Sequence, residues 1–287
     1  MFGIGRLLKK KVLYRFLFFA LGNLFTKMQI LKKFKKRLNA KKKNLKYSTN
    51  LDAINQFEYM ISSQNNEDGI IDHITNKICI SKFFVEIGVE FSEFNCLQLI
   101  KNGWSGIIIE ANQEECQRLK LCIDYFFPNN KIIILNIFVT KDNLNEILSF
   151  HVKNKIIDFL SIDIDGIDYY VLKNLDLKNV NSICCEYNYS FGRERKLSIP
   201  YIDNFYHKGD YYFGASLSAF SDLLESKHFF LACVESAGVN AFFVKEKFNK
   251  YFKKISPLLS FREQSRMNRN LKDKIYNASK NFNLIEV

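Results

Sequence analysis

Acidic residues are absent from the first 47 positions, which hold 15 of the 42 lysine and arginine residues of this 287-residue chain. The remainder therefore has 27 basic and 30 acidic residues, a net charge of −3. Because a nucleic-acid-binding domain normally carries a positively charged face, this balance argues against nucleic acid as a partner. The positive charge belongs to an N-terminal arm, residues 1–47.

A long apolar run is also lacking. The strongly apolar segment Val12–Phe25 has 14 residues and contains Arg15, whereas a membrane-spanning helix needs about 20 apolar residues. Lysines and bulky apolar residues follow it in place of a small-residue cleavage site, so export is not expected. Two interpretations of the arm remain open. It is either a basic amphipathic segment on an anionic membrane surface, or a solvated helical extension or oligomer contact.

Cysteines with C-x-x-C spacing are missing, and the number of cysteines, seven, is odd. Most of them lie in apolar or helical surroundings. This pattern is typical of reduced, packed thiols in a cytoplasmic protein and gives no disulfide framework.

Short apolar runs alternate with helix-length amphipathic stretches from Lys82 onward, which predicts a largely parallel sheet with helices on both faces. The expected strands are Phe83–Ile87, Gly106–Glu110, Ile132–Asn136, Ile157–Asp163, Ser182–Glu186, Phe229–Val234 and Ala241–Lys245. The expected helices are Glu93–Asn102, Gln113–Phe126, Lys141–Leu148, Asp168–Leu175 and Ala215–Lys227. The connection Glu235–Asn240 is too short for a parallel crossover, so the last two strands should form an antiparallel hairpin.

These elements predict an α/β, Rossmann-like sheet of seven strands in residues 48–250. The basic arm precedes this domain, and residues 251–287 are expected to form a helical C-terminal extension.

The first strand ends in an acid followed by a glycine, Val85-Glu86-Ile87-Gly88-Val89-Glu90. A glycine here lets the backbone pass close under a bound nucleoside, and the acid can hold an ammonium group of the ligand. Glu110 closes the second strand 24 residues after Glu86, where a carboxylate accepts hydrogen bonds from both ribose hydroxyls. We expect Glu86, Gly88, Glu90 and Glu110 to bind a nucleoside-containing cofactor.

Several blocks in order resemble the FkbM-like family and related class I S-adenosylmethionine-dependent methyltransferases of bacterial glycan and natural-product pathways. The blocks are Ser63–Ile70, Phe84–Val89, Gly103–Gly106, Glu110, Ser161–Gly166, Glu186–Asn188 and Gly238–Phe243. The resemblance covers residues 60–245 and implies S-adenosylmethionine as cofactor, with Asp163 also at the cofactor site. Class I methyltransferases share the predicted seven strands with an antiparallel end. At one place the chain departs from the pattern, because Phe91-Ser92 stands where similar sequences usually carry Asp-Gly; Ser92 then requires a negative φ.

Oxygen-bearing side chains end two neighbouring strands: Asp163 and Asp165 the fourth, Glu186 and Asn188 the fifth. The carboxyl ends of parallel strands meet at one sheet edge, so these four residues should converge. They could hold a hard divalent cation such as Mg²⁺. Alternatively, Asp163 or Glu186 acts as general base toward an acceptor hydroxyl, while Asp165 caps the next helix.

The long connection 187–214 is the expected place of the acceptor pocket. His207 is a further candidate base there. The same connection carries side chains able to stack on sugar rings or pair with phosphate or carboxylate, namely Arg193, Arg195, Tyr201, Tyr211 and Tyr212.

The resemblance implies an O-methyltransferase that methylates a sugar hydroxyl in bacterial surface polysaccharide biosynthesis. It would work in the cytoplasm or peripherally on the inner face of the membrane, with a sugar or glycan-precursor acceptor. Two alternatives stay open: a metal-dependent glycosyltransferase-like enzyme, since Asp-x-Asp occurs there too, and a non-catalytic membrane-associated module that keeps the fold. The pairing of Glu86 with Glu110 argues against the glycosyltransferase. Homo-oligomerisation is compatible with all three.

Overall fold

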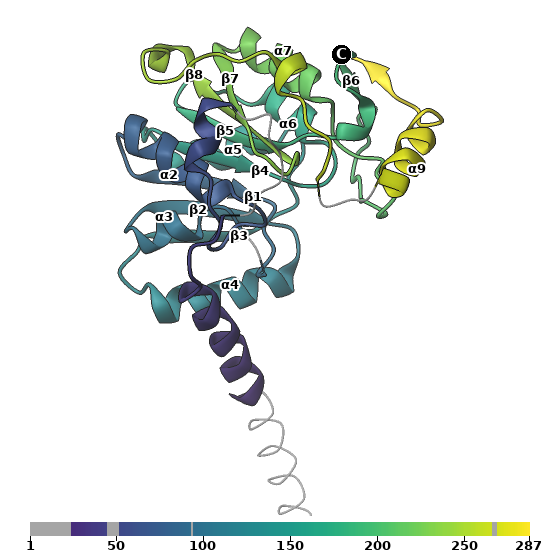
Figure 1. The fold of residues 1–287 in the computed structure, drawn as a ribbon. Helices are drawn as coiled ribbons and strands as arrows, with labels where there is room; N and C mark the ends of the chain where they lie inside the picture. Colours follow the sequence, from purple (N-terminus) through teal and green to yellow (C-terminus); the bar gives the residue numbers. More distant parts are fainter. Residues whose placement is uncertain (1–23, 45–51, 93, 266–268) are drawn as a thin grey trace, which may run out of the picture.

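The computed structural model describes residues 24–44, 52–92, 94–265 and 269–287, and its centre is a seven-stranded sheet in the order β3-β2-β1-β4-β5-β8-β7 (Figure 1). The strands are β1 (Phe83–Ile87), β2 (Ser105–Glu110), β3 (Ile132–Asn136), β4 (Phe159–Ile162), β5 (Ser182–Glu186), β7 (Phe229–Val234) and β8 (Asn240–Lys245). The pairs from β3 to β5 are parallel, whereas β8 is antiparallel to both β5 and β7. This order and these directions are those of the Rossmann-like class I methyltransferase fold, as the sequence predicted.

Helices cover both faces of the sheet. On one face α2 (Glu67–Ile78), α3 (Leu97–Lys101) and α4 (Gln113–Phe126) share a core with Phe84 of β1. On the other face α5 (Leu144–Val152), α6 (Asp168–Asn174) and α7 (Leu217–Ser226) share a core with Val85. Because successive strand residues point to opposite faces, the apolar residues of β1 contribute to both cores.

Three helices, α3, α5 and α7, begin later than predicted, and for α7 the reason is that Ser216 is its N-cap. The stretch before Leu97 is a loop, because Asn95 and Cys96 donate their backbone N–H groups to the carboxylate of Glu86 rather than to a helix; Glu93 lies outside the described residues. Similarly, α5 starts at Leu144, since Thr140 and Asn143 bond to each other's backbone N–H in a turn. The sequence analysis did not predict α2.

Most of the predicted arm lies outside the described residues, including Val12–Asn23. Its described part is helical over residues 24–38 and then pairs with the domain through Lys43, whose N–H and carbonyl both bond to Met60. None of the described helices combines the length and the apolar character that crossing a membrane requires.

The C-terminal extension packs on the domain and is partly helical. It contains α8 (Pro257–Ser260), α9 (Arg269–Ser279) and β9 (Ile285–Glu286), and β9 pairs antiparallel with β6 (Leu197–Ser198) in a separate two-stranded sheet. Ile275 of α9 is buried in the core. Short 3-10 helices complete the chain: η1 (Ala53–Phe57), η2 (Tyr189–Phe191) and η3 (Glu246–Phe248).

Candidate active site

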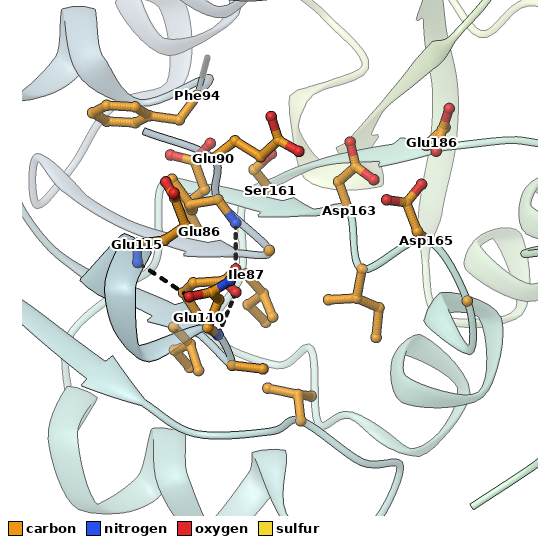
Figure 2. A pocket seen from close by; sticks show the side chains of 18 of the residues that line it. Glu86, Ile87, Glu90, Phe94, Glu110, Glu115, Ser161, Asp163, Asp165 and Glu186 are labelled. Carbon is orange, nitrogen blue, oxygen red and sulfur yellow. Dashed lines mark hydrogen bonds between the residues drawn. The ribbon is translucent and has the colours of Figure 1, made fainter. Parts of the chain in front are cut away.

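A cleft of about 920 Å³ opens at the carboxyl ends of the parallel strands. Its wall is made by the ends of β1, β2, β4 and β5 and by the loops that follow them (Figure 2). In open α/β sheets this edge is where ligands bind, because the strand ends and helix starts leave polar groups free to face a crevice. The cleft is therefore the candidate active site.

Gly88 makes the sharp turn at the floor of the cleft. Its φ of +77° is in the left-handed region, and its N–H donates to the carbonyl of Ile109 at 3.0 Å. The backbone of Asp163 passes directly beside it, and the N–H of Asp163 donates to the carbonyl of Ile87 at 2.9 Å. Only glycine combines this conformation with so close an approach of two backbones.

The turn continues through Phe91 and Ser92. Neither Phe91 nor Ser92 has a positive φ, so Ser92 meets the requirement for a negative φ at this position. The N–H of Phe91 donates to Oε2 of Glu115 at 2.6 Å, and the hydroxyl of Ser92 donates to Glu90 at 3.2 Å. Glu90 itself is exposed and lines the cleft.

Glu110 lies at the tip of β2, half-buried in the cleft wall. Its Oε2 accepts a hydrogen bond from the N–H of Val89 at 2.9 Å, and its Oε1 accepts one from the N–H of Asn112 at 2.6 Å (Figure 2). A carboxylate has about four acceptor sites, so two remain for the hydroxyls of a ligand. Glu110 thus ends β2 as expected, and its contact with a cofactor stays a prediction.

Glu86 also lines the cleft, but its carboxylate is held by the protein. Its two oxygens accept the N–H groups of Asn95 at 2.6 Å and Cys96 at 2.9 Å, which fixes the loop before α3. Burial raises the pKa of Glu86 to about 7. The side chain is thus a loop anchor, and the expected contact with a ligand ammonium stays a prediction.

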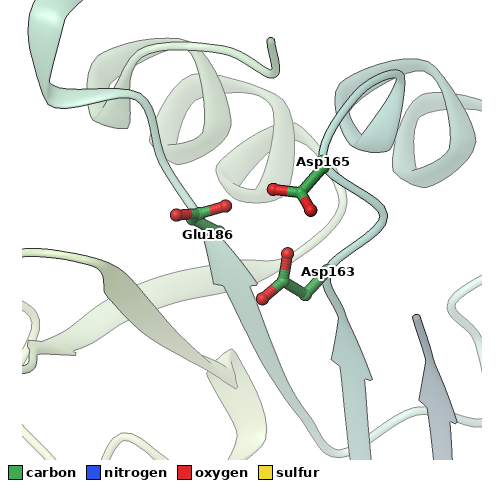
Figure 3. A group of neighbouring side chains, drawn as sticks. All are labelled: Asp163, Asp165 and Glu186. Atoms are coloured by element: carbon green, nitrogen blue, oxygen red, sulfur yellow. The ribbon is translucent and has the colours of Figure 1, made fainter. Parts of the chain in front are cut away.

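Three carboxylates meet at the ends of β4 and β5: Asp163, Asp165 and Glu186 (Figure 3). One oxygen from each lies within 4.8 Å of the others. Burial, followed by the neighbouring carboxylates, raises the pKa of both Asp163 and Glu186 well above the ordinary range. Like charges this close oppose each other's ionisation, so each carboxylate binds a proton more strongly than it would alone.

Asp165 does not cap the following helix, so the expectation that it would, made together with the general-base alternative, is wrong. Its φ of +50° turns its exposed side chain toward the carboxylate group, and the N-cap residue of α6 is Ile167. Asp168 closes the loop instead, since its carboxylate accepts the N–H groups of Ile164 at 2.9 Å and Gly166 at 3.0 Å.

Asn188 is not with the three carboxylates, although the sequence placed it there. It is 1% exposed, and its Oδ1 accepts hydrogen bonds from the N–H and hydroxyl of Ser190. Its Nδ2 donates to the carbonyls of Tyr211 and Phe213 at 2.8 and 3.0 Å. With both amide atoms used in this way, Asn188 positions the 199–213 loop and is a poor metal ligand.

That loop reaches the cleft through Phe205, Tyr206 and His207. Tyr206 is 82% exposed, and Nε2 of His207 is buried without a hydrogen-bond partner among the described residues. The aromatic and basic residues expected to bind the acceptor do not line the cleft; Arg195, for example, pairs with Glu286 at 2.9 Å. The other residues expected to bind the acceptor are likewise outside the cleft wall, namely Arg193, Tyr201, Tyr211 and Tyr212.

Sequence reasoning missed several polar residues of the cleft wall: Gln64, Asn95, Ser161 and Asn240. Asn95 donates to the hydroxyl of Ser161 at 3.0 Å, and Asn240 donates to Glu67 at 3.0 Å. Gln64, Ser161 and Asn240 all lie in blocks of the family resemblance, which is the signal that could have found them.

The cleft is strongly acidic. Seven carboxylates line it, and the described residues contribute no lysine or arginine to its wall. The carboxylates are Glu86, Glu90, Glu110, Glu115, Asp163, Asp165 and Glu186. Such a wall favours neutral or cationic ligands and repels anionic ones.

A scan against protein-family models gives no match, and a search of curated proteins gives none either. Similar solved structures include the N-terminal domain of EvdMO1 with SAH bound, at 13% identity over 64% of this chain and 80% of that chain, with a TM-score of 0.42. The METTL16 methyltransferase domain has 14% identity over 62% of this chain and 66% of that chain, with a TM-score of 0.41. An S-adenosylmethionine-dependent methyltransferase from Clostridium acetobutylicum ATCC 824 has 10% identity over 62% and 90%, with a TM-score of 0.38. Values this low support no inference about cofactor or substrate, and the fold assignment rests on strand order and direction.

Proposed function

We propose that the protein is an S-adenosylmethionine-dependent O-methyltransferase that methylates a sugar hydroxyl in bacterial surface glycan biosynthesis. The observation that carries this proposal is one cleft with two functional ends. Glu110 and the Gly88 turn form one end, and Asp163 and Glu186, whose pKa values are raised, form the other. A cofactor site thus lies beside a site for proton removal.

The cofactor end fits a nucleoside. Glu110 keeps free acceptor sites for ribose hydroxyls, and Gly88 lets the turn lie directly against the backbone of Asp163 at the floor of the cleft. Ile137 and Val139 add apolar wall for a base. When bound, S-adenosylmethionine supplies an electrophilic methyl group, and the chain has to orient an acceptor and take up its proton.

The acceptor end fits a neutral polyhydroxylated molecule. Carboxylates accept hydrogen bonds from hydroxyls, and the exposed ring of Tyr206 offers a face on which a sugar ring can stack. Since no lysine or arginine of the described chain lines the cleft, the reacting part of the acceptor carries no phosphate or carboxylate of its own.

The acceptor hydroxyl must lose its proton as the methyl group is transferred. The raised pKa of the Asp163–Glu186 pair suits a general base, because the pair binds a proton more strongly than an ordinary carboxylate. His207 lies in the same cleft and can orient the hydroxyl through its unpartnered Nε2. A divalent cation held by Asp163, Asp165 and Glu186 is the alternative means of activating the hydroxyl.

Contact with an anionic membrane surface is a further part of the proposal. The described arm, residues 24–44, has nine basic residues and no acidic one, and each can contribute about 1 kcal/mol near an anionic bilayer. Leu24, Phe25 and Met28 are exposed on its first turns at 55%, 64% and 60%. Sedimentation with phosphatidylserine vesicles tests this; binding equal to that on neutral phosphatidylcholine vesicles would contradict it.

Calorimetric titration with S-adenosylhomocysteine tests the cofactor site. The wild type should bind it, and Glu110→Ala should bind at least about tenfold more weakly, because hydrogen bonds to a charged group are lost. The matched control is Glu114→Ala, whose side chain is 77% exposed on the adjacent turn. No binding by the wild type, together with binding of a nucleotide sugar, would favour the glycosyltransferase alternative; binding of neither would favour the non-catalytic one.

A further inference from the structure

The helix over residues 24–38 packs directly on the turn that follows β1. Phe34 is 1% exposed, and its ring stacks on Phe91 at a centroid distance of 5.6 Å and an interplanar angle of 30°. On its other side it stacks on Phe126 of α4, at 5.7 Å and 28°. Phe34 therefore joins the arm, the cofactor turn and the end of α4.

A groove of about 390 Å³ separates the helix from the turn on one side of this contact. Its wall contains Lys33, Phe34 and Arg37 of the helix, Glu90, Phe91 and Ser92 of the turn, and Glu115 and Arg118 of α4. Glu90 and Glu115 also line the candidate active site. The turn is thus a thin wall, with the helix on one side and the cofactor end of the cleft on the other.

Hydrogen bonds to two carboxylates also support the turn. Val89 and Phe91 each give one backbone hydrogen bond to a side chain, to Glu110 and Glu115 respectively, and those carboxylates belong to the cleft wall themselves. Glu90 and Ser92 are exposed. Two side chains of this turn pack into the fold: Val89, which is 3% exposed, and Phe91, whose ring stacks on Phe34.

We infer that Phe34 is a positioning residue for the cofactor site, and that the arm helix holds the 88–92 turn in its binding conformation through the Phe34–Phe91 stack. For cofactor affinity this inference rests on the proposed function. Loosening the turn means that a bound ligand has to order it again, so affinity falls without the loss of any direct contact. The expected loss is roughly 5- to 150-fold, the usual range of coupling between sites.

The test uses the full chain and three variants. Phe34→Ala removes the ring; Phe34→Leu keeps most of the apolar volume but removes the stack; Gln29→Ala is the control, because Gln29 is exposed on the same helix. Thermal unfolding, S-adenosylhomocysteine titration and hydrogen exchange of the turn amides are measured for each. We expect Phe34→Leu to unfold close to the wild-type temperature, to exchange faster at residues 89–92 and to bind the ligand more weakly, while Gln29→Ala matches the wild type.

Unchanged affinity and unchanged exchange in Phe34→Leu would overturn the inference. If the wild type itself does not bind S-adenosylhomocysteine, the proposed function fails, and hydrogen exchange alone decides the inference. Faster exchange confined to the turn then supports it, and equal exchange in all variants refutes it.

Discussion

The backbone carbonyl oxygen of Asp163 lies 1.6 Å from the point where a β-carbon on residue 88 would be placed. The ends of β1 and β4 therefore touch through their main chains, and the floor of the cleft depends on the absence of one carbon atom. This contact fixes the position of the 88–92 turn relative to Asp163.

Gly88→Ala should abolish S-adenosylhomocysteine binding and lower the free energy of unfolding. Gly103→Ala is the matched control, because its φ of +79° carries the same conformational cost while nothing lies within 4 Å of the added carbon. The control should lose about 1–2 kcal/mol and keep its affinity. Equal effects of the two substitutions in calorimetry and denaturant unfolding would show that the contact with Asp163 is unimportant.

Glu186→Gln should lower kcat for methyl transfer by about 10²- to 10⁴-fold, the usual contribution of a general base. Affinity for S-adenosylhomocysteine should stay near that of the wild type, because Glu186 lies at the reaction end of the cleft. Wild-type activity should survive EDTA. Loss of activity in EDTA, with recovery on adding Mg²⁺, would instead assign the three carboxylates to a metal site.

Stability should fall as the pH rises from about 5 to about 8. Burial raises the pKa of Glu235 to about 8 and that of Glu86 to about 7, from an ordinary value of 4.5. The folded chain then binds more protons than the unfolded chain in this window, and the free energy of unfolding drops by up to about 1.4 kcal/mol per pH unit for each such group. Denaturant unfolding at several pH values measures the slope, and Glu235→Gln should make it shallower. An equal slope in the variant would contradict the assignment.

His207→Gln should raise KM for the sugar acceptor several-fold while leaving S-adenosylhomocysteine affinity unchanged. The reason is that His207 enters the cleft from the 199–213 loop, which Asn188 connects to the end of β5. Initial rates at varied acceptor concentration measure this. Tyr125→Ala, at a 65% exposed position on α4, is the control for a surface aromatic change. If affinity for S-adenosylhomocysteine falls by the same factor as KM rises, the assignment of His207 to the acceptor is contradicted.

Strand positions could be predicted because buried parallel strands need continuous apolar runs. β1, β3, β5 and β7 have the predicted bounds, and Glu110 follows at the tip of β2 from the same reasoning. The carboxylate group could be predicted as well, since Asp163 and Glu186 end adjacent strands.

What could not be predicted depends on the path of the backbone in loops. Asp165 precedes α6, and Asp168 is its first residue. The positive φ of Asp165 decides that Asp168, and not Asp165, accepts hydrogen bonds from the N–H groups of the loop. Asn188 follows β5 as expected, but the carbonyls of Tyr211 and Phe213 come back to it from a distant part of the chain. No local pattern indicates such long-range partners.

The insertion of β8 between β5 and β7 has a consequence for synthesis of the chain. While a ribosome makes the protein, β5 emerges well before β8, so one edge of the parallel sheet has no partner until about residue 245 has been added. Unpaired edges invite association with other strands. Asn240, which lines the cleft, arrives with β8, so the nascent chain can complete neither its sheet nor the wall of the cleft before β8 has been made.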